Sequence, residues 1–235
     1  MAFLRLILIF VVSFNLLPAN PLTDKLLKFS DKNTGHVAYP DLYYEINIAE
    51  LNTSTSLYLY YDTRVQYYID LYLNQRKEQL KEIVHLSDRY FPLFEKHLDT
   101  NKIPVEIKYL PVLESALSPT ACSPSAAVGL WQFKEKTGRY YGLLINNIRD
   151  DRTDPELSTM AACRYLKDLY REFHDWNLAL LAYNAGPVAV RKALKKNGNS
   201  ADLQSIISDL PEPARNYLPA LIAIIYLFHD YNTHF

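Results

Sequence analysis

The chain has 235 residues, of which 49% are hydrophobic and 22% charged, and its formal net charge is −1. This length suits one sizeable domain, or one domain with a smaller extension. The near-neutral charge gives no electrostatic footprint for nucleic acid, so we expect a neutral or mildly charged ligand and no nucleic-acid partner. The unusual feature is 19 tyrosines, many of them between Tyr39 and Tyr72. Most are expected to pack helices, although tyrosine also suits sugar stacking.

The first 19 residues have the pattern of a secretory signal peptide. A single positive charge at Arg5 precedes an apolar run from Leu6 to Leu17, which is shorter than the roughly 20 residues of a membrane-spanning helix. We therefore predict cleavage near Ala19 and an exported protein of the periplasm or cell envelope. An uncleaved anchor is the alternative, because the cleavage signal is imperfect. A lipid anchor is not expected, since no Cys lies near this segment.

Residues 20–60 look irregular, and helical spacing of apolar residues begins at Asp62. Asp62 or Thr63 is expected to cap the first helix, and Asp154-Pro155-Glu156 is a strong helix start. In chain order, the expected helices are 65–73, 76–87, 89–98, 105–117, 129–137, 155–173, 176–183, 188–196, 202–208 and 213–228, with a long loop over 138–153. No alternating strand pattern follows residue 60, so the sequence predicts a mostly α domain.

Glu114 lies in the apolar stretch LPVLESALS, residues 110–118. In a helix its same-face neighbours would be Leu110, Pro111, Leu117 and Ser118, none of which can neutralise a carboxylate. Desolvation without a cation raises the pKa of a carboxyl, as in glycosidase general acids. A helix-surface Glu with no special role is the plain alternative.

Acidic residues are missing around this position. Residues 115–134 and 176–201 contain no Asp or Glu. Most glycosidases place two carboxylates about the scissile bond. If Glu114 is catalytic, the chain is expected to use one carboxylate and to recruit its second group from the substrate.

Four segments carry a family resemblance, in the order ESALSPTACSPSAAVGLWQF, TGRYYGL, LLAYNAGP and LPEPARNYLPALIA. Over about residues 60–230 the chain resembles the lytic transglycosylases, whose domain is of the soluble-lytic-transglycosylase and goose-lysozyme-like type. The resemblance implies a lysozyme-like helical fold, with an N-terminal extension over 20–100 and a catalytic domain over 101–235. It also implies non-hydrolytic cleavage of the β-1,4 bond between N-acetylmuramic acid and N-acetylglucosamine in peptidoglycan, which leaves 1,6-anhydro ends.

The site residues are carried over from this resemblance. Glu114 matches the single acid and base of the family, and Ser115, Ser123, Gln132, Tyr183 and Asn184 match substrate-binding positions. A turn-capping role is the alternative for Ser123. An Asn at the place of Asn184 more often supports the turn, because Asn tolerates the left-handed conformation. Trp131 is expected in the core rather than as a sugar platform. Gly129 and Gly186 are expected to serve backbone requirements, a close approach and a tight helix stop.

Two positions depart from the family pattern. The last motif usually carries Glu where this chain has Pro213, and Glu212 stands one place early. A one-residue shift turns a helical side chain by about 100°, which puts one groove contact in doubt. Val188 and Ala189 replace a second glycine after AYNAG.

No cofactor is implied, and no metal motif is visible. Asp150, Asp151 and Asp154 lack the ligand pattern of a calcium loop, so capping and salt bridges are expected there. Cys122 and Cys163 are expected to be small semi-buried residues, with a disulfide left open.

Two rival functions remain open from sequence. A hydrolytic muramidase would need a second carboxylate, for which Glu212 and Glu106 are poor candidates by spacing. A wall-binding or assembly protein with weakened catalysis is suggested by Pro213 and Val188. In each case the expected partner is a peptidoglycan strand and the expected state a monomer, with peripheral membrane or envelope-complex association left open.

Overall fold

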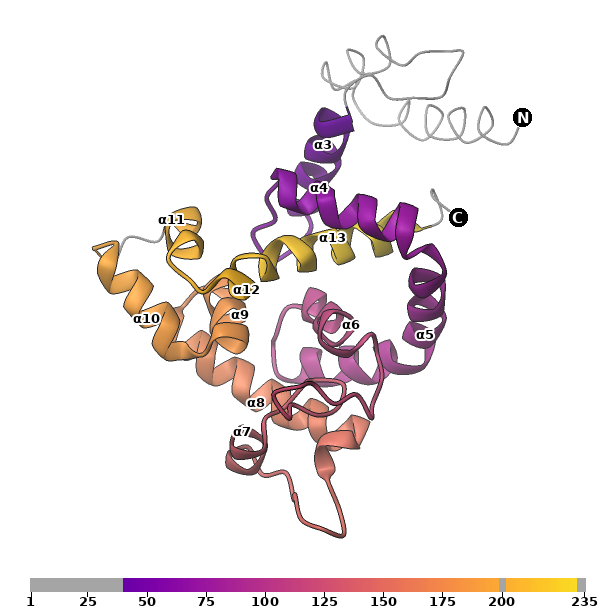
Figure 1. The fold of residues 1–235 in the computed structure, drawn as a ribbon, viewed down its shortest axis with the longest axis vertical. Coiled ribbons are helices and arrows are strands. Elements are labelled where there is room, and N and C mark those ends of the chain that lie inside the picture. The colour runs from indigo at the N-terminus through magenta and orange to yellow at the C-terminus, as the bar shows by residue number, and fades with distance from the viewer. Residues whose placement is uncertain (1–39, 199–201, 232–235) are drawn as a thin grey trace.

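The computed structural model describes residues 40–198 and 202–231. The predicted signal segment 1–19 and residues 20–39 of the predicted extension lie outside the described residues. In chain order the helices are α3 (Pro40–Asn52), α4 (Thr63–Asp70), the π-helix η1 (Leu71–Gln75), α5 (Lys77–Thr100), the 3-10 helix η2 (Val105–Tyr109), α6 (Leu110–Ser115), α7 (Glu135–Tyr140), the 3-10 helix η3 (Asp151–Thr153), α8 (Pro155–Phe173), α9 (Trp176–Ala185), α10 (Pro187–Lys196), α11 (Leu203–Ser208), α12 (Glu212–Arg215) and α13 (Tyr217–His229) (Figure 1).

The prediction of a mostly α fold is confirmed. Within the described ranges the β structure is limited to isolated bridges, which lie between residues 122 and 150. One hydrophobic cluster runs from Ile48 near the start of the described chain to Leu227 near its end. The core is therefore shared by the early and late helices.

Helix α13 organises the part of the core that carries the site. All of its residues from Tyr217 to Leu227 are buried, as expected of a helix that is hydrophobic all round. It packs against α4, α6 and α9, and Figure 1 shows α4 running alongside it. Helix α8 packs against α5 and α9. These contacts bring α6, α9 and α13 together around one region.

Helix α3 corrects the expectation of irregular structure over 20–60. Its run of tyrosine and isoleucine favours strands by intrinsic propensity, so the sequence did not indicate a helix. Tertiary packing stabilises it: Ile48 and Leu51 are buried, and the ring of Tyr44 meets Tyr226 of α13 edge-on at 5.5 Å. Packing overrides a weak local preference here.

Helix α5 is one helix where two were predicted, over 76–87 and 89–98. Pro92 lies inside it and removes one backbone hydrogen bond to the carbonyl of Asp88. Both Pro92 and Asp88 are exposed, so water can satisfy that carbonyl. The buried positions continue through the proline at helical spacing to Phe94 and Leu98, which keeps the helix intact.

The helix predicted over 105–117 is divided in two. A 3-10 turn, η2, changes to α-helix at Leu110, directly before Pro111. Helix α6 then ends at Ser115, because Ala116 and Leu117 have φ of 49° and 60°. Left-handed residues end a helix. Glu114 therefore lies in the last turn of a short helix.

The helix predicted over 129–137 is wrong for residues 129–134. This stretch forms tight turns in which Val128 bridges Cys122 and Phe133, and α7 begins only at Glu135. Gly129 and Gln132 have φ of 87° and 49°, which a helix cannot contain. Gly129 also makes the expected close approach: a Cβ there would lie 1.9 Å from the carbonyl oxygen of Arg152. Helix α7 and η3 likewise shorten the long loop predicted over 138–153.

The helix predicted over 213–228 is also divided, into α12 and α13, with Asn216 between them. Pro219 has no N–H to donate to the carbonyl of Arg215 four residues earlier, so the helix is interrupted at that point.

Elsewhere the predicted starts are confirmed by their caps. Asp62 accepts from the N–H groups of Arg64 and Val65 at the start of α4. Asp154 accepts from Leu157 N–H at the start of α8, which ends at Phe173 as predicted. Gly186, with φ of 84°, stops α9 two residues later than expected.

Candidate active site

Glu114 projects from the last turn of α6 and is half-buried. Its Oε1 accepts a hydrogen bond of 2.5 Å from the hydroxyl of Tyr217. Burial raises the pKa of Glu114 to about 7, although the Tyr217 hydrogen bond acts in the opposite direction. Among the described residues no ion pair involves this carboxyl. Glu114 is thus a carboxyl without a cation, poised to carry a proton near neutral pH.

Tyr217 is the residue of this site that sequence reasoning missed. It opens α13 and is buried, and burial followed by the charge of Glu114 raises its pKa well above its ordinary value. Its hydroxyl therefore stays protonated and donates. The available signal was its place in the motif LPEPARNYLP, but the 103 residues between Tyr217 and Glu114 hide the contact.

Tyr183 reaches the same region from α9. Its hydroxyl donates to the carbonyl of Trp131 at 2.6 Å, and its ring lies 5.2 Å from that of Tyr165 on α8. Burial raises the pKa of Tyr183 well above its ordinary value, and the charge of Glu114 contributes next. The structure therefore brings Tyr183 and Tyr217 together around Glu114.

Ser115 and Gln132 join α6 to the turns that follow it. The Ser115 hydroxyl lies 2.9 Å from the carbonyl of Pro111 and 3.0 Å from that of Leu130, so it bridges the two segments. The Gln132 side-chain nitrogen donates to the carbonyls of Gly129 (2.9 Å) and Ala121 (3.2 Å). These bonds use the amide nitrogen of Gln132 and leave its oxygen with no protein donor in the described chain.

Within the described chain, no side-chain hydrogen bond joins Ser123 or Asn184 to Glu114, Tyr183 or Tyr217. The Ser123 hydroxyl accepts from the N–H of Ala127 at 3.0 Å and meets the hydroxyl of Ser125 at 3.1 Å, which is the turn-capping arrangement weighed from sequence. Asn184 is exposed and lies inside α9, one residue before its end. The left-handed position belongs instead to Gly186, so the turn role weighed for Asn184 is wrong.

Trp131 belongs to the core, as predicted. Its indole nitrogen donates to the hydroxyl of Thr159 at 2.9 Å, and Phe94 packs on it edge-on at 5.4 Å. Because the Trp131 carbonyl accepts from Tyr183, this buried anchor also fixes the tyrosine beside Glu114.

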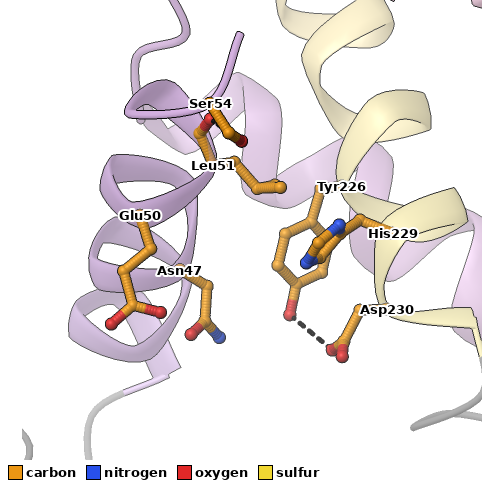
Figure 2. A pocket seen from close by; sticks show the side chains of 7 residues that line it. All are labelled: Asn47, Glu50, Leu51, Ser54, Tyr226, His229 and Asp230. Atoms are coloured by element: carbon orange, nitrogen blue, oxygen red, sulfur yellow. Dashed lines mark hydrogen bonds between the residues drawn. The ribbon is translucent and has the colours of Figure 1, made fainter. Parts of the chain in front are cut away.

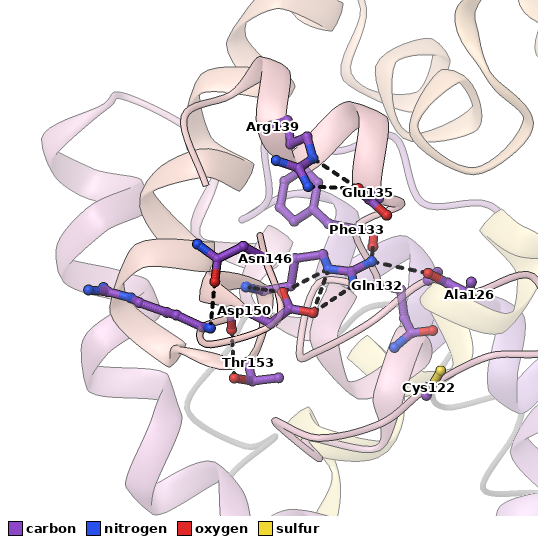
Figure 3. Close-up of polar contacts among 12 residues, drawn as sticks. Cys122, Ala126, Gln132, Phe133, Glu135, Arg139, Asn146, Asp150 and Thr153 are labelled. Carbon is purple, nitrogen blue, oxygen red and sulfur yellow. Dashed lines mark hydrogen bonds and ion pairs between the residues drawn. The ribbon is translucent and has the colours of Figure 1, made fainter. Parts of the chain in front are cut away.

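A buried arginine, Arg152, holds the turns of residues 121–133 in place. Three of its partners, Ala126, Phe133 and Asp150, are labelled in Figure 3. Arg152 Nη1 donates to the carbonyls of Ala126 (3.1 Å) and Phe133 (3.2 Å), and its Nη2 pairs with Asp150 at 2.6 Å. This pairing, with the amide of Arg152, lowers the pKa of Asp150.

The remaining acidic residues of this region have structural partners as well. Asp151 pairs with Arg149, and Asp154 caps α8. The capping and salt bridges expected for this acidic group are confirmed. Within the described ranges, no three His, Cys, Asp or Glu side chains are grouped so that they could hold a metal ion. Cys122 is exposed, Cys163 is buried and both are free.

A cavity of about 160 Å³ lies between α3 and the end of α13 (Figure 2). Its lining residues are Asn47, Glu50, Leu51, Ser54, Tyr226, His229 and Asp230. None of them belongs to the group around Glu114, so this cavity is separate from the candidate site. The helices in the described ranges also include none long and apolar enough to cross a membrane.

A known family matches the part of the chain that carries the half-buried Glu114 and Tyr183. The family model for the transglycosylase SLT domain matches residues 92–206. That stretch is therefore similar to the SLT domain, and the resemblance to lytic transglycosylases is confirmed.

Individual proteins similar to this chain are also named transglycosylases. The chain is 34% identical over 154 residues to membrane-bound lytic murein transglycosylase D of Escherichia coli strain K12, which covers 64% of this chain and 34% of that protein. It is 32% identical over 138 residues to peptidoglycan transglycosylase gp16 of Escherichia phage T7, covering 57% of this chain and 10% of that protein. The chain thus spans about a third or less of the length of these curated relatives.

Among solved structures, the 70 kDa soluble lytic transglycosylase SLT70 of Escherichia coli superposes with a TM-score of 0.54 at 22% identity. The match covers 68% of this chain and 29% of that one. This likeness supports the lysozyme-like helical fold that the motifs implied.

Proposed function

We propose that this chain is a peptidoglycan lytic transglycosylase in which Glu114 acts first as the acid and then as the base. The observation that carries the proposal is the state of Glu114: a half-buried carboxyl with no cation, a phenolic hydrogen bond from Tyr217 and a pKa of about 7. Such a group is present in both protonation states near neutral pH, which suits a residue that must give and then take a proton.

In the first step the protonated Glu114 gives its proton to the oxygen that links N-acetylmuramic acid to N-acetylglucosamine. The bond from that oxygen to C1 breaks, N-acetylglucosamine leaves as an alcohol, and positive charge develops at C1. In the second step the Glu114 carboxylate takes the proton of the muramoyl C6 hydroxyl while O6 bonds to C1. The product is a 1,6-anhydro ring, Glu114 is protonated again, and no water is consumed.

The surroundings of Glu114 agree with a single-carboxylate reaction. Residues 115–134, which follow Glu114, and residues 176–201, which include Tyr183, contain no Asp or Glu. The group that faces Glu114 from α13 is the neutral phenol of Tyr217. A hydrolase with two carboxylates would need a second one positioned across the bond.

The neighbouring side chains are proposed to place the glycan. Gln132 offers its amide oxygen, because its nitrogen is already bonded to the main chain, and Ser123 and Asn184 offer further polar groups to hydroxyls and acetamides. Tyr183 is proposed to face the reacting sugar from α9. The Ser115 hydroxyl bridges α6 and Leu130. We propose that Ser115 contributes to substrate binding mainly by holding these two segments together beside Glu114.

The proposal also covers the partner, the location and the domain organisation of the enzyme. A peptidoglycan strand is the partner, no cofactor or metal is required, and the enzyme acts as a monomer in the periplasm or cell envelope after export by residues 1–19. The segment 20–100 is proposed as an extension of the catalytic domain 101–235.

Mass spectrometry of muropeptides tests the proposal. The chain from residue 20 onward is incubated with purified peptidoglycan beside its Glu114→Gln and Glu212→Gln variants. We expect anhydro-muropeptides from the wild type and from Glu212→Gln, and none from Glu114→Gln. Reducing-end products would mean a hydrolase, and products lost on Glu212→Gln would identify the second carboxylate. Intact wall that retains the protein would mean a binding protein.

A further inference from the structure

Arg64 of α4 connects the early part of the chain to the segment that carries Tyr217. Its guanidinium is oriented by Asp62, whose Oδ2 accepts from Nε at 3.0 Å. From this position Nη1 donates to the main-chain carbonyl of Arg215 at 3.1 Å, and Nη2 donates to Oε1 of Gln204 at 3.3 Å. One side chain therefore ties α4 to both α11 and α12.

The carbonyl of Arg215 lacks a helical N–H donor, which leaves it available to Arg64. In a continuous helix the carbonyl of Arg215 would accept from the N–H of the residue four places on, but that residue is Pro219, which has none. The carbonyls at the end of a helix need other donors. Arg64 supplies such a donor to the carbonyl of Arg215, which lies two residues before Tyr217 in the chain.

Helix packing supports the same junction. Val65 and Ile69 of α4 are fully buried, and α4 packs along α13. Helix α12 has only four residues, so it has little stability of its own. The position of its end, and hence the direction in which α13 starts, depends on these contacts from outside.

We propose that Arg64 is a positioning residue that holds the α12–α13 junction so that the hydroxyl of Tyr217 stays on Glu114. The inference rests on the proposed function for its relevance to catalysis, but it makes a separate physical claim. Arg64 lies outside the SLT match over 92–206, so this role falls to the segment that precedes the domain.

The groups that face Glu114 determine whether its pKa rises or falls when Arg64 is replaced. They are Tyr217 from α13 and Tyr183 from α9, with Tyr165 of α8 behind Tyr183. Of these, the Tyr217 hydroxyl is the one that lowers the pKa of Glu114, against burial that raises it. If Tyr217 loses its hold on the carboxylate, the pKa of Glu114 rises further.

The experiment is a carbon-13 NMR titration of glutamate-labelled full chain, with Glu114→Gln identifying the Glu114 signal. Tyr217→Phe is expected to raise the Glu114 pKa, and Arg64→Ala to raise it by about 0.5, short of the Tyr217→Phe value. The double variant should match Tyr217→Phe alone, because Arg64 acts through that hydroxyl. Arg64→Lys, which keeps the charge but not the fork, should give a smaller rise. It also serves as the test if Arg64→Ala fails to fold. Arg89→Ala on α5 is the matched control, expected to leave the pKa unchanged.

An unchanged Glu114 pKa in the folded Arg64 variants would overturn the inference, and so would an Arg64 effect that persists in the Tyr217→Phe background. A fall in the pKa would also overturn it, since that would mean the site had opened to water. The titration needs no turnover, so it is independent of the proposed function: the expected shifts in a protein that makes no anhydro-muropeptides would retain the positioning role and reject the transglycosylase.

Discussion

The raised pKa of Glu114 suits the proposed proton transfer but makes the stability of the fold depend on pH. Burial raises its pKa from the ordinary 4.5 to about 7, so between these values the folded chain binds a proton that the unfolded chain releases. Stability therefore falls as pH rises through this window, and is fully regained only below the unfolded value. A carboxyl in this environment lowers the stability of the fold once it is ionised.

This linkage predicts that Glu114→Gln stabilises the fold at alkaline pH. The amide cannot ionise and can still accept from Tyr217. We expect its free energy of unfolding to exceed that of the wild type by about 1–2 kcal/mol near pH 8, discounted because the side chain is half-buried, and by nothing near pH 4. Urea unfolding at the two pH values measures the difference, with Glu82→Gln on the exposed side of α5 as control. A difference that is the same at both pH values would show that the charge of Glu114 carries no folding penalty.

At the scale of elements, the sequence was informative where a local cap decides the structure. Asp62 and Asp154 start α4 and α8 as expected, because the capping bond is made within three residues. It was misleading where distant contacts decide. The turns of residues 129–134 depend on the buried Arg152, which binds the carbonyls of Ala126 and Phe133, and no spacing rule reveals that partner.

Gly129 and Gly186 both have positive φ, but only Gly129 also lies too close to other main chain to accept a side chain. Comparing them distinguishes the cost of a steric clash from the cost of backbone strain. Gly129 (φ 87°) has the carbonyl oxygen of Arg152 at 1.9 Å from the position of a Cβ, whereas Gly186 (φ 84°) has nothing within 4 Å. Gly186→Ala should cost about 1–3 kcal/mol from backbone strain alone. Gly129→Ala adds a clash with main chain and should cost roughly 4 kcal/mol or more. Chemical denaturation of both variants gives the comparison, and equal losses would mean that the turns of residues 121–133 can move away from Arg152.

At the scale of the whole molecule, the site is assembled from pieces that only the tertiary fold brings together. Motifs indicated Glu114 and Tyr183, since each matches a family position by its immediate neighbours. They could not indicate that Tyr217 touches Glu114, nor that the Ser115 hydroxyl is already bonded to the protein. Local patterns specify which side chains are present, while the order in which helices pack specifies which of them meet.

The same packing bears on the boundary expected between residues 100 and 101, which remains a prediction. Helix α5 supplies Phe94, Leu80 and Leu98 to the core with no exposure, and Phe94 rests on Trp131. A chain that begins at residue 101 loses these contacts together with those of α4 on α13. Each large side chain removed from a core costs about 2–5 kcal/mol, so the loss of many such contacts at once exceeds the roughly 5–15 kcal/mol by which a domain is usually stable.

We therefore expect residues 101–235 alone to lack a cooperative fold, whereas residues 40–235 keep one. Near-ultraviolet circular dichroism distinguishes the two, because it reports fixed aromatic packing. In the full chain, a Trp176→Phe background leaves Trp131 as the single tryptophan. Its fluorescence and the far-ultraviolet signal should then follow one common denaturant transition. A native near-ultraviolet spectrum from 101–235, or two separate transitions in the full chain, would mean instead that residues 101–235 fold independently of the helices before them.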